Sequence, residues 1–144
     1  MNIEQLIPFL AFLLLRTMAA GQDMKCIENI CIQETDNLDG QPVYQVADNM
    51  PVYPGGMEAM FKHISKNIRL HGSKNKLGGK MLITFIVDTT GHVRNVCIVK
   101  SCFEKGVYYK KEEIIDVFRQ LAVMQPWEHK GRKVPARFQL PIAF

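Results

Sequence analysis

The sequence predicts an α+β fold: a small three-stranded antiparallel sheet with two helices on one face and the C-terminal strand at the sheet edge. Two segments carry apolar residues every three or four positions, two β-branched runs flank a turn, and apolar residues alternate strictly at the end of the chain. These periods are those of amphipathic helices and half-buried strands. The order helix, strand, strand, helix, strand with short connections favours one antiparallel layer covered on one side.

The first 21 residues have the features of an export signal. Ten apolar residues, LIPFLAFLLL, precede Arg16 and the small residues MAAG. The run is shorter than the ~20 residues that a membrane-spanning helix needs, and it fits a signal peptide cleaved before Gln22. No base precedes the run and Glu4 lies there instead, so a short uncleaved anchor in the inner membrane is the alternative. Both interpretations put the rest of the chain outside the cytoplasm.

An acidic arm and a basic body follow this segment. Residues 22–61 contain seven acids and one base, whereas residues 62–144 contain sixteen bases and six acids. Residues 22–50 are expected to be a largely irregular arm, with a turn at DNLDGQP and a short strand within VYQVA. Residues 51–144 then form the folded domain, which is long enough to fold alone.

The folded domain begins with a helix and a β-hairpin. After the breakers of MPVYPGG, apolar spacings of three and four predict a helix from Met57 to Leu70, with Gly72 as its expected stop. The stretch KMLITFIVDTTGHVRNVCIVKS predicts two strands joined by a turn from Asp88 to Gly91.

A second helix is predicted from Lys111 to Met124, shortly before the helix breaker Pro126. Its apolar residues again have the helical period. The acids near its start suit the positive end of the helix dipole; they are Glu112, Glu113 and Asp116. The turn HKGRK then leads to the last strand.

The last strand has two prolines on one parity. Apolar side chains alternate from Val134 to Phe144, and Pro135 and Pro141 lie among the odd positions between them. Alternate residues of a strand aim their backbone groups at the same edge, and proline within sheets is confined mainly to edges and bulges. The even residues are therefore expected to pair with a neighbouring strand, and the odd side is expected to stay open between the two prolines.

Two explanations fit such an open edge. Prolines and charges protect an edge against aggregation, which accounts for the pattern without any function. The edge can also accept an extended peptide by strand addition, or pair with a second copy of this chain. The predicted contact stretch consists of Val134, Pro135, Ala136, Arg137, Phe138, Gln139 and Leu140.

Several motifs of residues 51–144 resemble, in their order and spacing, the C-terminal domain of the energy transducer TonB. They are Pro54-Gly55-Gly56 before the first helix, Gly79 at the first hairpin strand, Asp88 and Gly91 in the turn, Trp127, Gly131 and the closing LPIAF. The closest likeness is to the form common in Bacteroidetes-type bacteria.

The resemblance implies a periplasmic interaction domain in energy-coupled transport across the outer membrane. Such a domain holds the N-terminal peptide of an outer-membrane transporter as a strand beside its own last strand. Arg137 and Gln139 would then be most exposed to the peptide backbone, and Trp127 would pack under the helix–strand junction. An inner-membrane complex driven by the proton gradient is the second partner that the resemblance implies.

The sequence departs from the family pattern in its tether. Typical members have a firm anchor and a long proline-rich spacer, whereas the arm here reaches at most about 100 Å when fully extended. His71-Gly72 stands where members of this type often carry Tyr-Pro, and Lys110–Glu113 replaces the usual small residues. The alternative function is an exported stand-alone domain that binds or scaffolds another protein, or pairs with itself, without transducing energy.

The four cysteines are expected to form disulfides, because an even number in an exported chain is typical of cross-links. They are Cys26, Cys31, Cys97 and Cys102. The last two lie on or near one strand, where five steps cover about 16 Å, and a disulfide needs Cα atoms within about 7 Å. Cys102 must therefore follow a turn or pair with the arm. Local pairing and a cross-link from arm to hairpin both stay open, as does a buried, unpaired Cys97.

Nothing in the sequence indicates catalysis. The chain has no glycine-rich phosphate loop, nucleophile elbow, paired acid–base device or metal motif, so we expect no enzyme activity, cofactor, metal or small-molecule substrate. Export and the lack of interleaved aromatics argue against nucleic acid. The first explanation for the basic residues is that they form a solvent-exposed face. The second is that they attract anionic lipid or an acidic partner. The histidines are expected to be separate surface residues: His63, His71, His92 and His129.

Overall fold

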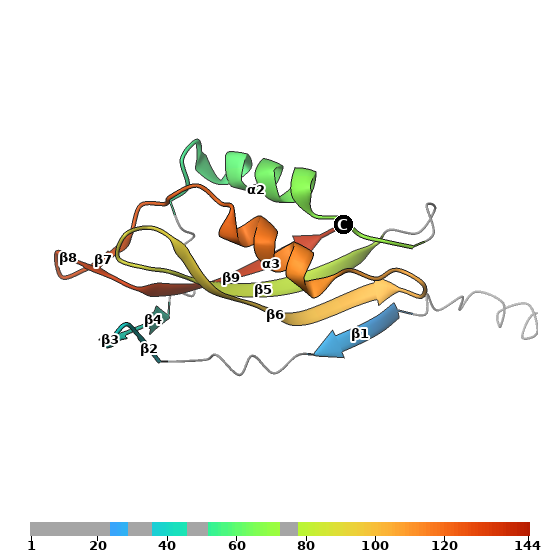
Figure 1. Cartoon of the computed structure of the whole chain (residues 1–144), viewed down its shortest axis with the longest axis horizontal. Helices are drawn as coiled ribbons and strands as arrows, with labels where there is room; N and C mark the ends of the chain where they lie inside the picture. Colours follow the sequence, from blue (N-terminus) through green and yellow to red (C-terminus); the bar gives the residue numbers. More distant parts are fainter. Residues whose placement is uncertain (1–23, 29–35, 46–51, 73–77) are drawn as a thin grey trace, which may run out of the picture.

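The computed structural model describes residues 24–28, 36–45, 52–72 and 78–144. Its helices are α2 (Gly56–Asn67) and α3 (Lys111–Arg119). Its strands are β1 (Met24–Glu28), β2 (Asn37–Leu38), β3 (Gln41–Pro42), β4 (Tyr44–Gln45), β5 (Gly79–Val87), β6 (Val93–Glu104), β7 (Trp127–His129), β8 (Arg132–Val134) and β9 (Ala136–Ala143). Both helices lie on one side of the sheet (Figure 1), and the predicted α+β class is confirmed.

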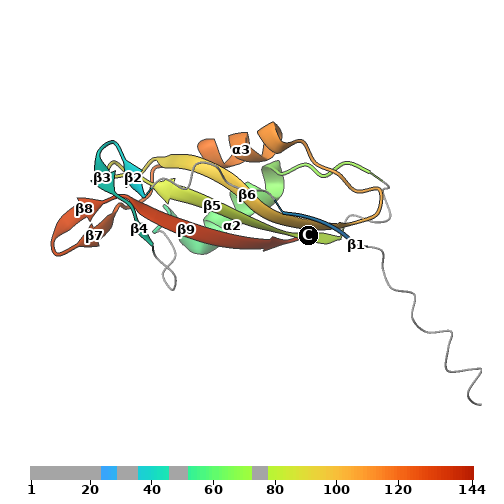
Figure 2. The ribbon, with the colours of Figure 1, turned by 90° about the horizontal axis from the view of Figure 1, so that it is seen from below.

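The main sheet has five strands in the order β1-β6-β5-β9-β4. The predicted three-stranded antiparallel sheet is therefore wrong in its strand number and its edges. Strands β6, β5 and β9 form the antiparallel centre that the sequence predicts, but β1 and β4 from the arm flank it on either side (Figure 2). The sheet is mixed, because β4 runs parallel to β9.

The helix-facing side of the sheet is built by alternate residues of β5 and β9. Antiparallel pairing places Phe85 opposite Phe138 and Ile83 opposite Leu140. All four side chains are at most 2% exposed, which confirms the alternation predicted for the last strand. Burying a side chain of this size stabilises a fold by about 1.5–3 kcal/mol. These pairs fix the register of β9, because a slip by one residue would turn its polar side chains into the core.

The two helices complete the core from above the sheet. Helix α2 buries Met60 and Ile64. Helix α3 contributes Phe118, whose ring centroid lies 5.6 Å from that of Phe85. Trp127 is half-buried and packs against the same cluster. The apolar face of each helix therefore packs on the sheet, and the two helices also contact each other.

Both helices end earlier than their apolar periodicity predicts. Helix α2 ends at Asn67 rather than Leu70, and the chain beyond it pairs His71 with Tyr108 through two backbone hydrogen bonds. Helix α3 ends at Arg119 rather than Met124. The N–H of Met124 donates to Gly91 at 2.9 Å instead of to its own helix. Tertiary partners for the backbone thus end both helices.

The arm contains short strands where the sequence predicted mostly irregular chain. Strands β2 and β3 pair as a hairpin around Asp39 and Gly40, which both have positive φ. Leu38 is buried at 8% exposure, and Asp39 lies 3.7 Å from Arg94 of β6. The short strand expected within residues 43–47 is present as β4. These contacts fold the described part of the arm onto the body.

Candidate functional site: the outer side of the last strand

The backbone parity of β9 is as predicted. The N–H of the even residue Phe144 donates to Gly79 on the β5 side at 2.9 Å. The carbonyl of the odd residue Pro135 accepts from the Tyr44 N–H on the opposite side at 2.9 Å. Prolines at odd positions therefore leave the β5 ladder intact, because their missing N–H groups would point away from it.

The predicted position of the last strand at the sheet edge is wrong for the start of β9. Strand β4 lies outside it, with Tyr44 opposite Ala136 and Gln45 opposite Arg137. The predicted strand is also interrupted, since Val134 ends β8 and Pro135 stands between β8 and β9. The sequence analysis did not predict β4 as a neighbour of β9, because two residues are too few to show a periodic pattern.

Arg137 and Gln139, the two residues expected to be most exposed to a bound peptide, differ in their surroundings. Arg137 is only 8% exposed, opposite Gln45 on one side and Ile86 on the other. Gln139 is exposed. Gln45 of β4 lies opposite Arg137, and no described residue of β4 lies opposite Gln139.

Beyond Arg137, β9 is outermost among the described residues. The alternation of burial is clear there: Leu140 and Ile142 are buried, whereas Gln139, Pro141 and Ala143 are exposed. No described strand pairs with the outer side of this segment. The segment thus presents a backbone edge of about five residues, interrupted in its donors by Pro141, that can accept one extended strand.

A disulfide fastens the other edge of the sheet. Cys26 of β1 lies opposite Cys102 of β6 and is bonded to it, so the cross-link from arm to hairpin is confirmed. In the same pair of strands the Lys100 ammonium donates to Glu28 at 2.7 Å, and this hydrogen bond lowers the pKa of Glu28. A disulfide fits an oxidising compartment outside the cytoplasm.

The other two cysteines are only partly described. Cys97 is also disulfide-bonded, which excludes the unpaired buried residue that was one of the predicted alternatives. Cys31 lies outside the described residues.

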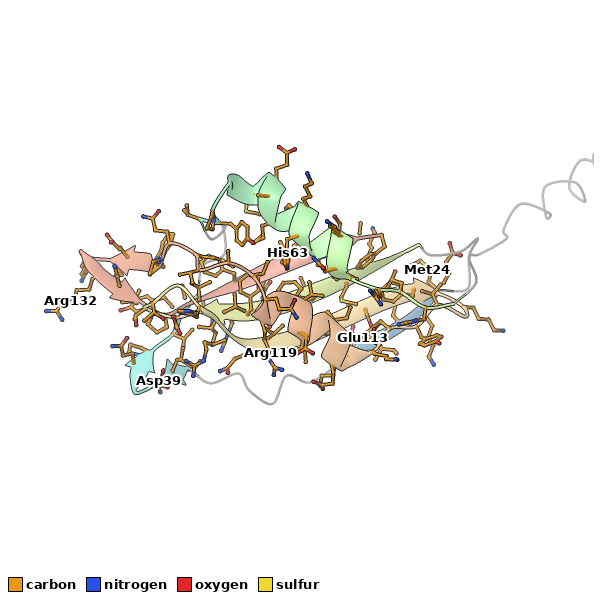
Figure 3. All side chains as sticks on the ribbon, turned by 45° about the horizontal axis from the view of Figure 1, so that its top comes forward. Met24, Asp39, His63, Glu113, Arg119 and Arg132 are labelled. Carbon is orange, nitrogen blue, oxygen red and sulfur yellow. A yellow bond between two sulfur atoms is a disulfide. The ribbon has the colours of Figure 1, made fainter. Side chains whose placement is uncertain are left out.

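A basic β-hairpin, β7–β8, was missed as a structural unit by the sequence prediction, which placed only a turn there. Trp127 pairs with Val134, and Lys130 and Gly131 form the turn with φ of 49° and 75°. Two successive positive φ values are typical of a two-residue hairpin turn, so the KG pair was the available signal. Figure 3 shows Arg132 near the end of this hairpin.

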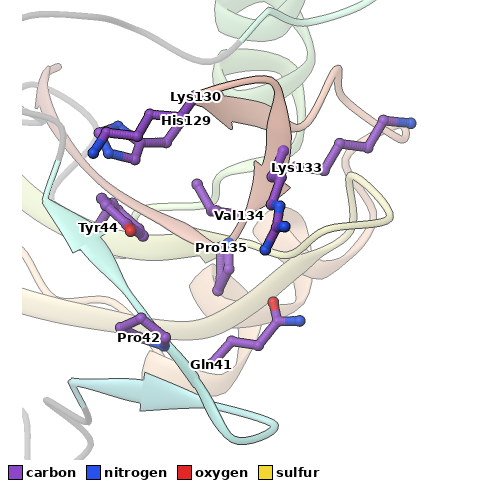
Figure 4. Close-up of a pocket in the computed structure, with 9 residues that line it drawn as sticks. Gln41, Pro42, Tyr44, His129, Lys130, Lys133, Val134 and Pro135 are labelled. Carbon is purple, nitrogen blue, oxygen red and sulfur yellow. The ribbon is translucent and has the colours of Figure 1, made fainter.

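A cavity of about 580 Å³ lies between this hairpin and the β3–β4 segment (Figure 4). It is lined by Gln41, Pro42, Tyr44, His129, Lys130, Arg132, Lys133, Val134 and Pro135. The Tyr44 and His129 rings form part of its wall, with centroids 4.8 Å apart. Val134 and Pro135 of the predicted contact stretch therefore line a cavity rather than an open edge.

Glu113 and His63 contrast in their surroundings. Glu113 lies 3.2 Å from both His71 and Lys110, and hydrogen bonds from these two groups lower the pKa of Glu113. His63 is half-buried, and its Nε2 is buried without a hydrogen-bond partner. Across the described ranges, no group of histidine, cysteine or acidic side chains could hold a metal ion.

No helix in the described parts of the chain is both long and apolar enough to span a membrane. No protein-family model matches this sequence, and no curated protein or solved structure matches it significantly.

Proposed function

We propose that this chain is an exported protein-interaction module of the TonB C-terminal type, which binds an extended peptide by adding it as a strand outside β9. The observation that carries the proposal is the outer side of β9 from Gln139 to Ala143, along which no described strand lies. An edge of this kind offers main-chain hydrogen bonds to an incoming strand, while pockets for alternate side chains give specificity.

Strand β4 supports this use of the edge. It adds to β9 from outside, in parallel, through the hydrogen bond from Tyr44 to Pro135. The outer side of β9 is therefore competent to bind a strand that comes from elsewhere in the chain. A peptide that follows β4 along the same edge would meet Gln139 first.

The partner in this proposal is the N-terminal peptide of an outer-membrane transporter. The order helix, strand, strand, helix, strand and the open end of the last strand support it, because the resemblance implies both. An inner-membrane complex driven by the proton gradient would supply the work. The module itself would catalyse no reaction.

A second candidate is a stand-alone binding domain that transduces no energy. It is favoured by the disulfide between Cys26 and Cys102 and by β4, which fold the described part of the arm onto the body. An arm held in this way is not a long spacer. Co-purification of the chain with a proton-driven membrane complex would contradict this second candidate and support the first.

The test of strand addition removes one backbone hydrogen-bond donor of β9. Gln139→Pro removes the N–H that faces outward, and the strand already carries a proline of the same parity at Pro141. We expect peptide affinity to fall about tenfold, because a carbonyl of the bound peptide would lose its partner. Binding is measured by titration with synthetic N-terminal peptides of outer-membrane transporters from the host.

The matched control is Gln139→Ala, which removes the side chain but keeps the N–H. It should bind these peptides like the parent chain. Equal binding by the parent and Gln139→Pro would show that the backbone edge is not the contact. Equal loss in both variants would instead assign the contact to the glutamine side chain.

A further inference from the structure

We propose that the cavity between the β7–β8 hairpin and the β3–β4 segment binds an amphipathic phosphate, meaning a phosphate group joined to an apolar body. This site is separate from the open end of β9 and does not depend on peptide binding there. The charge, the donors, the size and the rigidity of the cavity support such a ligand.

The cavity is strongly positive. Lys130, Arg132 and Lys133 line it together with His129, and no carboxylate does. Within the described residues, none of the three permanent cations takes part in an ion pair. Glu128 lies opposite Lys133 in the hairpin but does not line the cavity. Cations without an ion-pair partner in the wall of the cavity favour an anionic ligand.

The side chains that line the cavity supply mainly hydrogen-bond donors. Arg132 offers a planar fork that suits two oxygens of one phosphate, and the lysines supply point charges. The Gln41 amide and the Tyr44 hydroxyl can donate as well. A phosphate carries three acceptor oxygens and about 1.5 to 2 negative charges near neutral pH. A single carboxylate would leave more of these donors without a partner.

The size of the cavity requires more than a phosphate. About 580 Å³ lies within the range of roughly 300–1,000 Å³ of small-molecule sites, and one phosphate group occupies only a small part of it. The remaining wall is apolar and consists of Pro42, Val134, Pro135 and the ring of Tyr44. An apolar body attached to the phosphate would cover this wall and release water from it.

The two sides of the cavity are held in place before any ligand arrives. The Tyr44 N–H donates to the Pro135 carbonyl at 2.9 Å, which joins β4 to the start of β9. The Tyr44 ring also packs on His129 of the hairpin. Figure 4 shows Tyr44, His129 and Lys130 on one side of the space, with Lys133 and Gln41 on the other. Walls that are already in place lower the cost of ordering the site on binding.

Two sources share this chemistry: the head of an anionic phospholipid and a soluble phosphate ester. The experiment uses the oxidised chain purified from its host and three probes, namely dibutyryl phosphatidate, inorganic phosphate, and phosphatidylcholine vesicles containing long-chain phosphatidate. Backbone amide resonances report where each soluble probe binds, and sedimentation reports vesicle binding. We expect the short-chain phosphatidate to shift residues 41–44 and 129–135 and to bind more tightly than inorganic phosphate.

The test variant is Lys130→Gln/Arg132→Gln/Lys133→Gln. Its matched control is Lys62→Gln/Lys66→Gln/Lys105→Gln, which removes the same charge from exposed positions away from the cavity. We expect the test variant to weaken phosphatidate binding at least about tenfold and the control to leave it unchanged. Loss of vesicle binding in the test variant alone assigns the source to a lipid, and absence of vesicle binding assigns it to a soluble ester.

Three results would overturn the proposal. Equal weakening in both triple variants would show general charge attraction rather than a site. Phosphate binding as tight as phosphatidate binding would remove the role of the apolar wall. Failure of the short-chain phosphatidate to bind, with or without vesicle binding, would exclude the cavity as the place where a phosphate is held.

Discussion

Asp88 closes the turn between β5 and β6 with one carboxylate oxygen. Its Oδ1 accepts hydrogen bonds from the Thr90 N–H at 2.9 Å, the Thr90 hydroxyl at 2.6 Å and the His92 N–H at 3.0 Å. Burial acts to raise the pKa of Asp88, but the hydrogen bonds from Thr90 and His92 outweigh it, so the pKa lies below its ordinary value. The turn therefore depends on the ionised form of this residue.

Asp88→Asn should make the free energy of unfolding depend less on pH at acidic pH. Because the pKa is lower in the folded chain, the stabilisation is complete above the unfolded-state pKa near 3.9 and is lost as the pH falls through the folded-state pKa. Between about pH 5 and 2, the parent should lose more free energy of unfolding than the variant. Urea unfolding across this range measures the difference.

The control for this prediction is Asp116→Asn, which changes an exposed carboxylate 3.2 Å from Arg119 on α3. Exposed pairs contribute about 0–1 kcal/mol, so the pH dependence of this variant should follow that of the parent. An equally weakened pH dependence in both variants would mean that the hydrogen bonds to Asp88 are not the cause.

At the scale of elements, the β5–β6 turn also fixes the chain that follows α3. Gly91 has a φ of 87°, and a Cβ there would overlap the carbonyl oxygen of Met124. The Met124 N–H also donates a hydrogen bond to the Gly91 carbonyl. The glycine is thus needed both for its conformation and for close approach of two backbones.

Gly91→Ala is expected to destabilise the fold much more than Gly106→Ala. Gly106 has a similar φ of 91°, but a Cβ there meets nothing within 4 Å. The second variant measures the cost of the conformation alone, about 1–2 kcal/mol, whereas the first adds overpacking of about 1–3 kcal/mol. Urea unfolding gives both free energies. Equal costs would contradict the close approach to Met124.

Periodicity predicted the helices, the β5–β6 hairpin and the last strand of the body, but not the ends of the helices. The hairpin, both helices and the buried positions of the last strand follow from repeats of two and of three or four residues, since each repeat is a local property. The ends of α2 and α3 depend on distant backbone partners, Tyr108 and Gly91. The parity of the prolines correctly gave the orientation of the backbone groups in β9, but it could not show that β4 covers Ala136 and Arg137.

At the scale of the whole molecule, the disulfide between Cys26 and Cys102 joins residues 76 positions apart. All five residues of β1 are exposed, so this strand gains little from hydrophobic burial. Its pairing with β6 relies on the backbone ladder, the disulfide and the pair of Glu28 with Lys100. The cross-link is expected to be the main tie between this strand and the sheet.

Cys26→Ser/Cys102→Ser should lower the free energy of unfolding by about 2–4 kcal/mol, because a long loop in the unfolded chain is no longer closed. Amide hydrogens of β1 should also lose their protection against exchange, while those of β5 keep it. The control is Glu28→Gln, which weakens only the exposed pair with Lys100 and should change the free energy of unfolding much less than the double variant does. Unchanged protection of β1 in the double variant would show that the ladder alone holds this strand.

The sequence by itself determined the types, order and buried faces of the two helices, the β5–β6 hairpin and the last strand, because repeats of apolar residues are written locally along the chain. Only the tertiary structure decided what lies at the sheet edges, since β4 has two residues and β1 has no buried face. Backbone hydrogen bonds and a disulfide place these strands, and such contacts leave no period in the sequence. The basic cavity has the same origin, because the pairing of β4 with β9 and the contact of the Tyr44 ring with His129 bring residues 41–44 and 129–135 together.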